Sequence, residues 1–98
     1  MKSNIPEMTV SDFVAVFNQT INFAYPSVAI VGEISEIRIN RGKWVYFNLK
    51  DDNSSVKFFG SAYKLDAPYE DGMKVRVIGV PQLHSQYGFS IQIFEIKH

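Results

Sequence analysis

Aromatic and basic side chains alternate with apolar ones in the segment GKWVYFNLKDDNSSVKFFG, residues 42–60. Successive residues of a β-strand point to opposite faces, so one face of this segment would carry Trp44, Tyr46 and Phe59 together with Lys57. Aromatic rings stack on nucleotide bases of any identity, and cations between the rings attract phosphates. The residue types and their spacing therefore predict a surface that binds single-stranded nucleic acid.

The same region has a local excess of positive charge, although the formal net charge of the whole chain is zero. Between residues 37 and 50 every charged side chain is basic. Zero net charge argues against a polybasic protein that binds nucleic acid indiscriminately, and the cluster indicates phosphate contacts at one place. Alternatively, the basic cluster is only the solvated rim of a hairpin and binds no ligand. The residues expected to make phosphate or polar contacts are Arg38, Arg41, Lys43, Asn48, Lys57 and His84.

The sequence contains no set of residues that would support catalysis. The acidic pairs Asp51–Asp52 and Glu70–Asp71 lie beside turn-forming residues, and no third carboxylate or histidine joins them at a spacing suited to a metal ion. With no cysteine and two histidines, thiolate and structural zinc sites are excluded. We predict no catalytic residue, no metal site and no cofactor, and hence no enzymatic activity of this chain by itself.

Length and composition are those of one folded domain, residues 1–98. The chain has 46% hydrophobic and 20% charged residues, far from the composition of disordered proteins. Its longest apolar run, VAIVG, is too short to span a bilayer, and the first residues do not resemble a secretory signal. The absence of cysteine fits a reducing compartment. We therefore expect a cytoplasmic protein with no membrane partner.

One amphipathic helix is predicted over about residues 11–23. Thr9 and Asp12 can cap its start, and the residue before Pro26 is pushed out of helical geometry. We expect the apolar stripe of this helix to face the core of the domain. The stripe has the spacing of one helical face and consists of Phe13, Val14, Phe17 and Ile21.

After Pro26 the pattern becomes that of β-strands. The inward register of the first strand drifts, which predicts a bulge between Gly32 and Glu36. The connector 62–72 has room for one helical turn before Pro68. The five strands are expected at 28–39, 43–51, 56–61, 73–83 and 88–96.

This element order predicts a mainly β fold, a five-stranded Greek-key OB-fold barrel over about 27–97 preceded by the helix. An SH3-like barrel is the second possibility. It fits less well, because it would not normally need so long a first strand or a connector at that place. Val45, Phe47, Leu49, Val56 and Phe58 are expected in the core. The outer aromatic rings would then lie on the face that OB-folds use for oligonucleotides and oligosaccharides. Alternatively, those rings lie beneath the helix or pair across strands to stabilise the sheet.

The loop LHSQYG, residues 83–88, is a second candidate contact. In an OB-fold it would lie at the same mouth of the barrel as the loop carrying Arg41 and Lys43. Tyr87 is expected to stack on a base, and His84 to stack or to contact a phosphate. The alternative is a polar hairpin tip with no ligand.

Several motifs together resemble the N-terminal OB domain of the exodeoxyribonuclease VII large subunit. They occur in the family's order with nearly its spacing over almost the whole chain. The motifs are MTVSDF (8–13), VAIVGEIS (28–35), YFNLKD (46–51), EDGMKVRVIGVPQL (70–83) and YG (87–88).

The resemblance implies a single-stranded-DNA-binding module that delivers substrate to a nuclease core. The parent enzyme of this family degrades single-stranded DNA to oligonucleotides in the cytoplasm. The implied partners are single-stranded DNA, the remainder of the large subunit and the small subunits. Because the family's catalytic region has no counterpart in this sequence, we expect the chain to be a fragment of a longer protein.

The chain departs from the family pattern at several positions. Trp44 replaces a usual histidine, which should strengthen stacking, while SAYKL and HSQYG replace arginine-containing segments. We therefore expect weak, salt-sensitive binding by the isolated domain. Two other functions fit the same fold: a protein-interaction or assembly domain of the same subunit, and an anticodon-type RNA-binding module.

Overall fold

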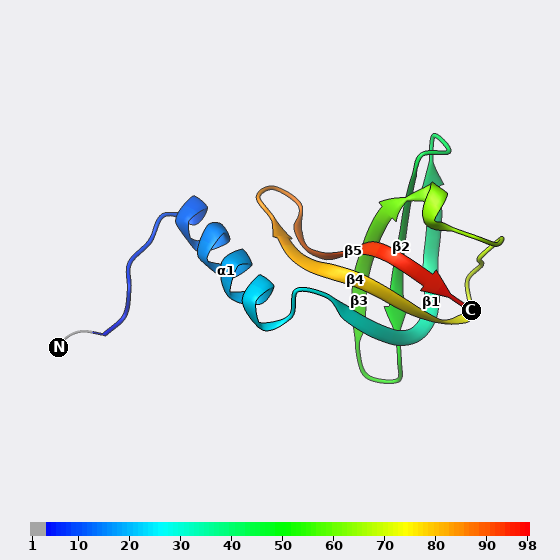
Figure 1. Ribbon diagram of the computed structural model, residues 1–98, viewed down its shortest axis with the longest axis horizontal. Coiled ribbons are helices and arrows are strands. Elements are labelled where there is room, and N and C mark those ends of the chain that lie inside the picture. Colours follow the sequence, from blue (N-terminus) through cyan, green and yellow to red (C-terminus); the bar gives the residue numbers. More distant parts are fainter. Residues whose placement is uncertain (1–3) are drawn as a thin grey trace.

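The computed structural model describes residues 4–98, which form one helix and a five-stranded barrel (Figure 1). The strands close in the order β1-β2-β3-β5-β4, antiparallel except for the parallel contact of β3 with β5. This is the predicted mainly β OB-fold architecture with an N-terminal helix. The elements are α1 (Val10–Ala24), β1 (Val28–Asn40), β2 (Trp44–Lys50), β3 (Ser55–Ser61), the 3-10 helix η1 (Ala62–Lys64), β4 (Lys74–His84) and β5 (Gly88–Lys97).

Alternation along β2 and β3 separates a core face from an outer face. Val45, Phe47 and Leu49 of β2 are buried, and the rings of Phe47 and Phe58 stack at a centroid distance of 5.5 Å. Val56 is half-buried and packs against this core. The inward set expected from the sequence is confirmed, and Trp44 and Tyr46 consequently lie on the outside.

The predicted bulge in β1 is present. Ile34 faces the core before the bulge and Ile37 faces it afterwards, so the alternation of the strand changes there. The register against β2 shifts between Ser35 and Arg38, and Glu36 has a φ of 54°. Asp71 Oδ1 holds the bulge by accepting a hydrogen bond of 2.9 Å from the backbone N–H of Ile37. The extra residue lets Ile37 pack against the core and sends Glu36 and Arg38 to the outer face.

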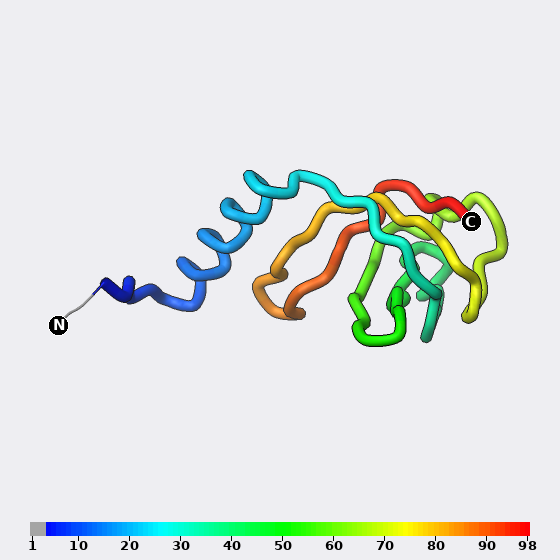
Figure 2. The backbone as a smooth tube through the Cα atoms, turned by 90° about the horizontal axis from the view of Figure 1, so that it is seen from below, coloured from blue at the N-terminus to red at the C-terminus, as the bar shows by residue number. Residues whose placement is uncertain are grey.

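The apolar stripe of α1 does not face the core, so that expectation was wrong. Thr9 caps the helix as predicted, accepting a 3.0 Å hydrogen bond from Asp12 N–H. No side chain of α1 is buried, and Phe13 remains 52% exposed. Figures 1 and 2 show α1 beside the barrel, alongside the β4–β5 hairpin, rather than over an end of it.

The segment between β3 and β4 takes the place that the helix was expected to occupy in the core. Its Tyr69 is buried in the core cluster, and Leu65 and Met73 pack against that cluster. The Tyr69 hydroxyl donates a 2.6 Å hydrogen bond to Asp66 Oδ1. Burial, with this bond as the second cause, raises the pKa of Tyr69 to about 12, and the same bond lowers the pKa of Asp66. The strands and this connector make up the core, and α1 packs instead on the β4–β5 hairpin, where the Phe17 ring contacts the Phe89 ring.

Candidate nucleic-acid interface

A groove of about 730 Å³ crosses the outer face of the barrel. Its floor is the outer side of β2 and β3, and its walls come from β1 after the bulge and from the β4–β5 hairpin. The groove exists because the β4–β5 hairpin extends past the barrel: β1 pairs with β4 only as far as Val28 and Gly79, whereas β4 and β5 pair as far as His84 and Gly88.

Strand pairing places an aromatic pair at the centre of the groove floor. Tyr46 lies opposite Phe59, and Asn48 lies opposite Lys57 in the adjacent part of the ladder. All four residues line the groove, and both rings are partly exposed. The Arg38 guanidinium carbon lies 4.9 Å from the centroid of the Tyr46 ring, a cation–π geometry. The floor therefore offers flat apolar surfaces with the cations Arg38 and Lys57 in the same groove.

The turn between β4 and β5 provides a second aromatic pair. The His84 and Tyr87 rings stack at a centroid distance of 4.6 Å, and both residues line the groove. His84 Nδ1 accepts hydrogen bonds from the backbone N–H groups of Gln86 (3.1 Å) and Tyr87 (3.3 Å). His84 thus shapes the turn and positions Tyr87, whose side chain is 80% exposed.

Three residues expected at the interface lie outside the groove. Trp44 shares the outer face of β2 and is 46% exposed, yet it does not line the groove. Arg41 and Lys43 are exposed in the turn between β1 and β2, where Arg41 has a φ of 56°. Figure 1 shows this turn well apart from the tip of the β4–β5 hairpin, so the groove does not unite the two loops. The expected members that it does bring together are Tyr46, Phe59, Tyr87, Arg38, Asn48, Lys57 and His84.

The groove also contains residues that sequence reasoning missed. Glu36 lines it and accepts a 3.1 Å hydrogen bond from Asn48 Nδ2 through its Oε2 atom. Phe89 lines it as well, and its ring meets the ring of Phe17 edge-on at 6.5 Å. The bulge could have indicated Glu36 from the sequence, because an extra residue in a strand changes which face of the sheet the neighbouring side chains point to. Phe89 lies two positions before the buried Ile91 and therefore on the same face of β5. It is exposed because the β4–β5 hairpin extends past the barrel at this point.

The acidic pairs lie outside the groove, and the hydrogen bonds that Asp51 and Asp71 accept are structural: those of Asp51 form a turn, whereas Asp71 bonds a residue of β1. Asp51 Oδ1 accepts hydrogen bonds of 2.9 Å from the backbone N–H groups of Asn53 and Ser54, and these bonds lower the pKa of Asp51. Asp71 holds the bulge. Within residues 4–98, no three His, Asp or Glu side chains are grouped in a way that would hold a metal ion. Nor does this part of the chain contain a helix long and apolar enough to cross a membrane.

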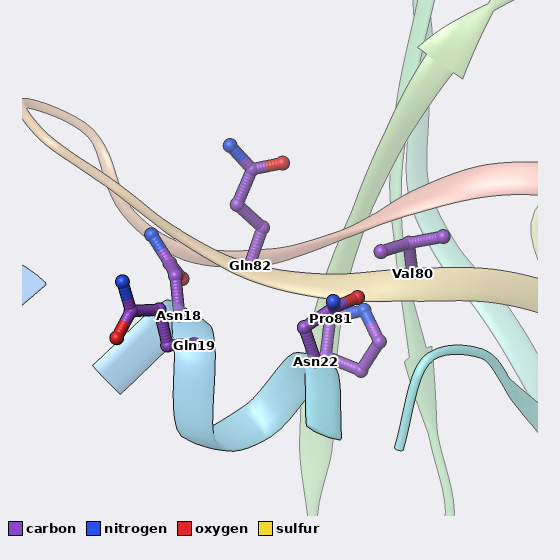
Figure 3. Close-up of a pocket in the computed structure, with 6 residues that line it drawn as sticks. All are labelled: Asn18, Gln19, Asn22, Val80, Pro81 and Gln82. Atoms are coloured by element: carbon purple, nitrogen blue, oxygen red, sulfur yellow. The ribbon is translucent and has the colours of Figure 1, made fainter. Parts of the chain in front are cut away.

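A second, shallower cavity of about 320 Å³ lies between α1 and β4 (Figure 3). Its lining is uncharged, with amide side chains of α1 facing the segment from Val80 to Gln82. Next to it, Asn18 Nδ2 donates to Leu83 O (2.9 Å) and Asn18 Oδ1 accepts from Leu83 N–H (2.8 Å). The Asn18 side chain thus pairs with the part of the β4 edge that β1 does not cover. This contact attaches the helix to the β4–β5 hairpin.

A family model described as an OB-fold nucleic acid binding domain matches residues 8–97 of this chain. Among curated relatives, the exodeoxyribonuclease 7 large subunit of Clostridium botulinum is 34% identical over 99 residues, which are 95% of this chain and 25% of the relative. The corresponding protein of Rhodospirillum centenum is 34% identical over 100 residues, 96% of this chain and 19% of the relative. The chain thus spans a quarter or less of the length of these relatives.

Solved structures show the same fold at low sequence identity. A chain of a replication protein A heterotrimer bound to ssDNA superimposes with a TM-score of 0.60 at 21% identity, covering 72% of this chain and 55% of that chain. Entamoeba histolytica asparaginyl-tRNA synthetase, in complex with asparaginyl-adenylate, superimposes with a TM-score of 0.63 at 15% identity, covering 72% of this chain and 20% of that chain. At these identities the likeness concerns the fold alone.

Proposed function

Because the chain belongs to the OB-fold nucleic acid binding domain family, we propose that it binds single-stranded DNA in the groove and delivers it to a nuclease core. The similarity to exodeoxyribonuclease 7 large subunits supports that setting. In this proposal the nuclease degrades single-stranded DNA to oligonucleotides in the cytoplasm. The remainder of the large subunit and the small subunits are the protein partners, and this domain contributes binding rather than catalysis.

The observation that carries the proposal is the cross-strand pair of Tyr46 and Phe59 in one groove with the cations Arg38 and Lys57. A base stacked on an aromatic side chain contributes about 1–3 kcal/mol to binding. A duplex hides its base faces, so stacking rings favour single strands. Cations beside the rings add a sequence-independent attraction to phosphate that decreases with salt. Tyr87, across the groove, supplies a further stacking surface.

Residues outside the groove have secondary roles in this proposal. Trp44 lies on the same strand face as Tyr46, two positions away, and is exposed enough to stack on a nucleotide that leaves the groove. Arg41 and Lys43 would contact phosphates of the same extended strand. Their contributions should be smaller than that of the groove, because no neighbouring ring or wall fixes the nucleotide there.

The test is an anisotropy titration of labelled oligothymidine, repeated with a duplex and at several salt concentrations. We expect tighter binding of the single strand and an affinity that falls as salt rises. Phe59→Ala should weaken binding, whereas Phe13→Ala, a ring of α1 outside the groove, should leave it unchanged. Equal affinity for single strand and duplex, or equal effects of the two substitutions, would contradict the proposal.

A second candidate function is assembly within the same subunit, and the exposed apolar side of α1 favours it. Val10 and Phe23 are 79% and 90% exposed, and the helix has no buried side chain. Such side chains are frequent at protein interfaces. If assembly were the main role, the isolated chain would self-associate in analytical ultracentrifugation and would not bind oligonucleotides. An anticodon-type RNA module shares the fold, and competition between DNA and RNA strands of matched sequence separates it from the first proposal.

A further inference from the structure

The groove contains one feature that phosphate binding does not explain, the carboxylate of Glu36. Among the described residues that line the groove it is the only acidic side chain, and it shares the groove with Arg38 and Lys57. A negative charge at this place repels a phosphate backbone and lowers the sequence-independent part of the affinity. A carboxylate here would contribute to binding if it accepted hydrogen bonds from the edge of a base.

The backbone holds Glu36 in this place at a conformational cost. Its φ of 54° is in the left-handed region, which non-glycine residues adopt infrequently and often at functional sites. The neighbouring residue, Ile37, is fixed by the hydrogen bond of its N–H to Asp71, so the bulge does not depend on the Glu36 side chain. Bulges commonly redirect a side chain in this way. Asp71 therefore holds the bulge, while the Glu36 carboxylate makes one hydrogen bond, to Asn48, and extends into the groove.

The hydrogen bond between Glu36 and Asn48 orients both side chains over the groove floor. Asn48 Nδ2 donates to Glu36 Oε2 at 3.1 Å. Within residues 4–98 no donor contacts the second carboxylate oxygen, Oε1, and none contacts Asn48 Oδ1. The pair thus presents two acceptors without partners, beside the rings of Tyr46 and Phe59 on which a base would stack.

We propose that Glu36, oriented by Asn48, is a specificity-determining residue that makes the groove prefer guanine to thymine. This inference rests on the proposed binding of single strands. A carboxylate only accepts hydrogen bonds, and in single strands the Watson–Crick edge of a base is open to such contacts. On that edge guanine offers adjacent N1–H and N2–H₂ donors, which match Glu36 Oε1 and the second lone pair of Oε2, the atom that also accepts from Asn48. Thymine offers one N3–H between two carbonyl oxygens that repel the carboxylate.

Three strands and three forms of the protein test this proposal. The strands are oligothymidines about nine nucleotides long, within the span of an OB-fold site, with guanine, hypoxanthine or thymine at the centre. Hypoxanthine differs from guanine by loss of the N2 amino group. The proteins are the wild type, Glu36→Gln and the control Glu33→Gln, which removes a carboxylate of the same strand outside the groove. Thermal melts verify that all three are folded.

We expect the wild type to bind the guanine strand about tenfold more tightly than the thymine strand, the scale of a good two-bond base contact. Hypoxanthine should lose most of that preference. Glu36→Gln should reduce the preference and also increase affinity for the thymine strand, because a repulsive charge is removed. Glu33→Gln should preserve the preference.

Each of three results would overturn the proposal. Equal binding of guanine and thymine strands by the wild type excludes a base-reading role, although single-strand binding itself would stand. An unchanged preference in Glu36→Gln assigns the discrimination to another residue. Failure of every strand to bind the folded wild type overturns both this inference and the proposed function.

Discussion

The groove and helix α1 both expose aromatic side chains, but the surroundings of those rings differ. In the groove, Tyr46 and Phe59 belong to paired strands and lie among Arg38 and Lys57. Helix α1 exposes Phe13 and other apolar side chains, and its sequence contains no lysine or arginine. The comparison teaches that exposed rings alone do not indicate a nucleic-acid site. Rings held by a sheet in one groove with cations meet the requirements of a base and its phosphate together.

The largest expected difference between the two regions follows from removing their rings. Tyr46→Ala combined with Tyr87→Ala should weaken binding of single-stranded DNA by at least about tenfold, because each stacked base contributes about 1–3 kcal/mol. Phe13→Ala in α1 should not change the affinity. Fluorescence anisotropy with a labelled oligothymidine measures both. Tyr87→Ala alone serves as a variant whose fold is safe, since this side chain is 80% exposed. A similar loss from Phe13→Ala would remove the distinction between the regions.

The cations of the groove should contribute more to the salt dependence of binding than cations elsewhere on the barrel. Replacing Arg38 and Lys57 by glutamine should reduce the slope of log affinity against log salt by about 1.4, or about 0.7 for each phosphate of the single strand that is no longer neutralised. The control replaces two exposed cations of β4 outside the groove, Lys74 and Arg76. Titrations at several salt concentrations give the slopes. If the control pair changes the slope as much as the groove pair, the attraction is diffuse and the groove has no special part in it.

A smaller effect is expected where the helix joins the hairpin. Asn18→Ala removes both hydrogen bonds to Leu83, each of which contributes about 0.5–1.5 kcal/mol net. Hydrogen exchange at the Leu83 amide should accelerate, while affinity for single strands should stay close to that of the wild type. A strong decrease in DNA binding by this variant would show that the helix and the groove act together.

The smallest effect on binding is expected from the connector, whose titration affects stability instead. The pKa of Tyr69 is raised to about 12, so between about pH 10 and 12 the unfolded chain loses this proton while the folded chain retains it. The stability associated with the neutral phenol is therefore full below about pH 10 and is lost toward pH 12. Asp66 has a lowered pKa, and its contribution is lost in acid.

Urea unfolding of the wild type and Tyr69→Phe at pH 8 and pH 11 measures this dependence. The wild type should lose more stability at high pH than the variant. An equal loss in the two proteins would assign the pH dependence to other groups. Anisotropy at pH 8 should show that Tyr69→Phe binds DNA normally.

The local rules of strands made the barrel predictable from sequence. Alternation assigned Phe47 and Phe58 to the core, Tyr46 to the outside, and a bulge to the first strand where its apolar register changes parity. The helix was located well from its capping residue Thr9 and its apolar spacing. Periodicity identifies an apolar face but not the surface that covers it, so the position of α1 was mispredicted. Tyr69, in an irregular connector without periodicity, fills the core instead.

The candidate site was predictable only where it depends on strand parity. Tyr46, Phe59 and Lys57 share a face by alternation, and the structure places all three in the groove. The groove walls depend on how far the β4–β5 hairpin extends beyond its neighbours, which local sequence does not specify. For this reason Phe89 was missed, and Arg41 and Lys43 were expected nearer to Tyr87 than they are. Glu36 was missed because its outward facing depends on the exact position of the bulge in β1.

Backbone amide chemical-shift mapping with an unlabelled oligothymidine identifies the surface of the protein that binds the single strand. We expect the largest shifts along the groove, at Arg38, Tyr46, Lys57 and Tyr87, while the amides of α1 remain unchanged. Shifts that concentrate on α1, or the absence of any shift at low salt, would contradict the assignment of the groove as the single-strand-binding surface.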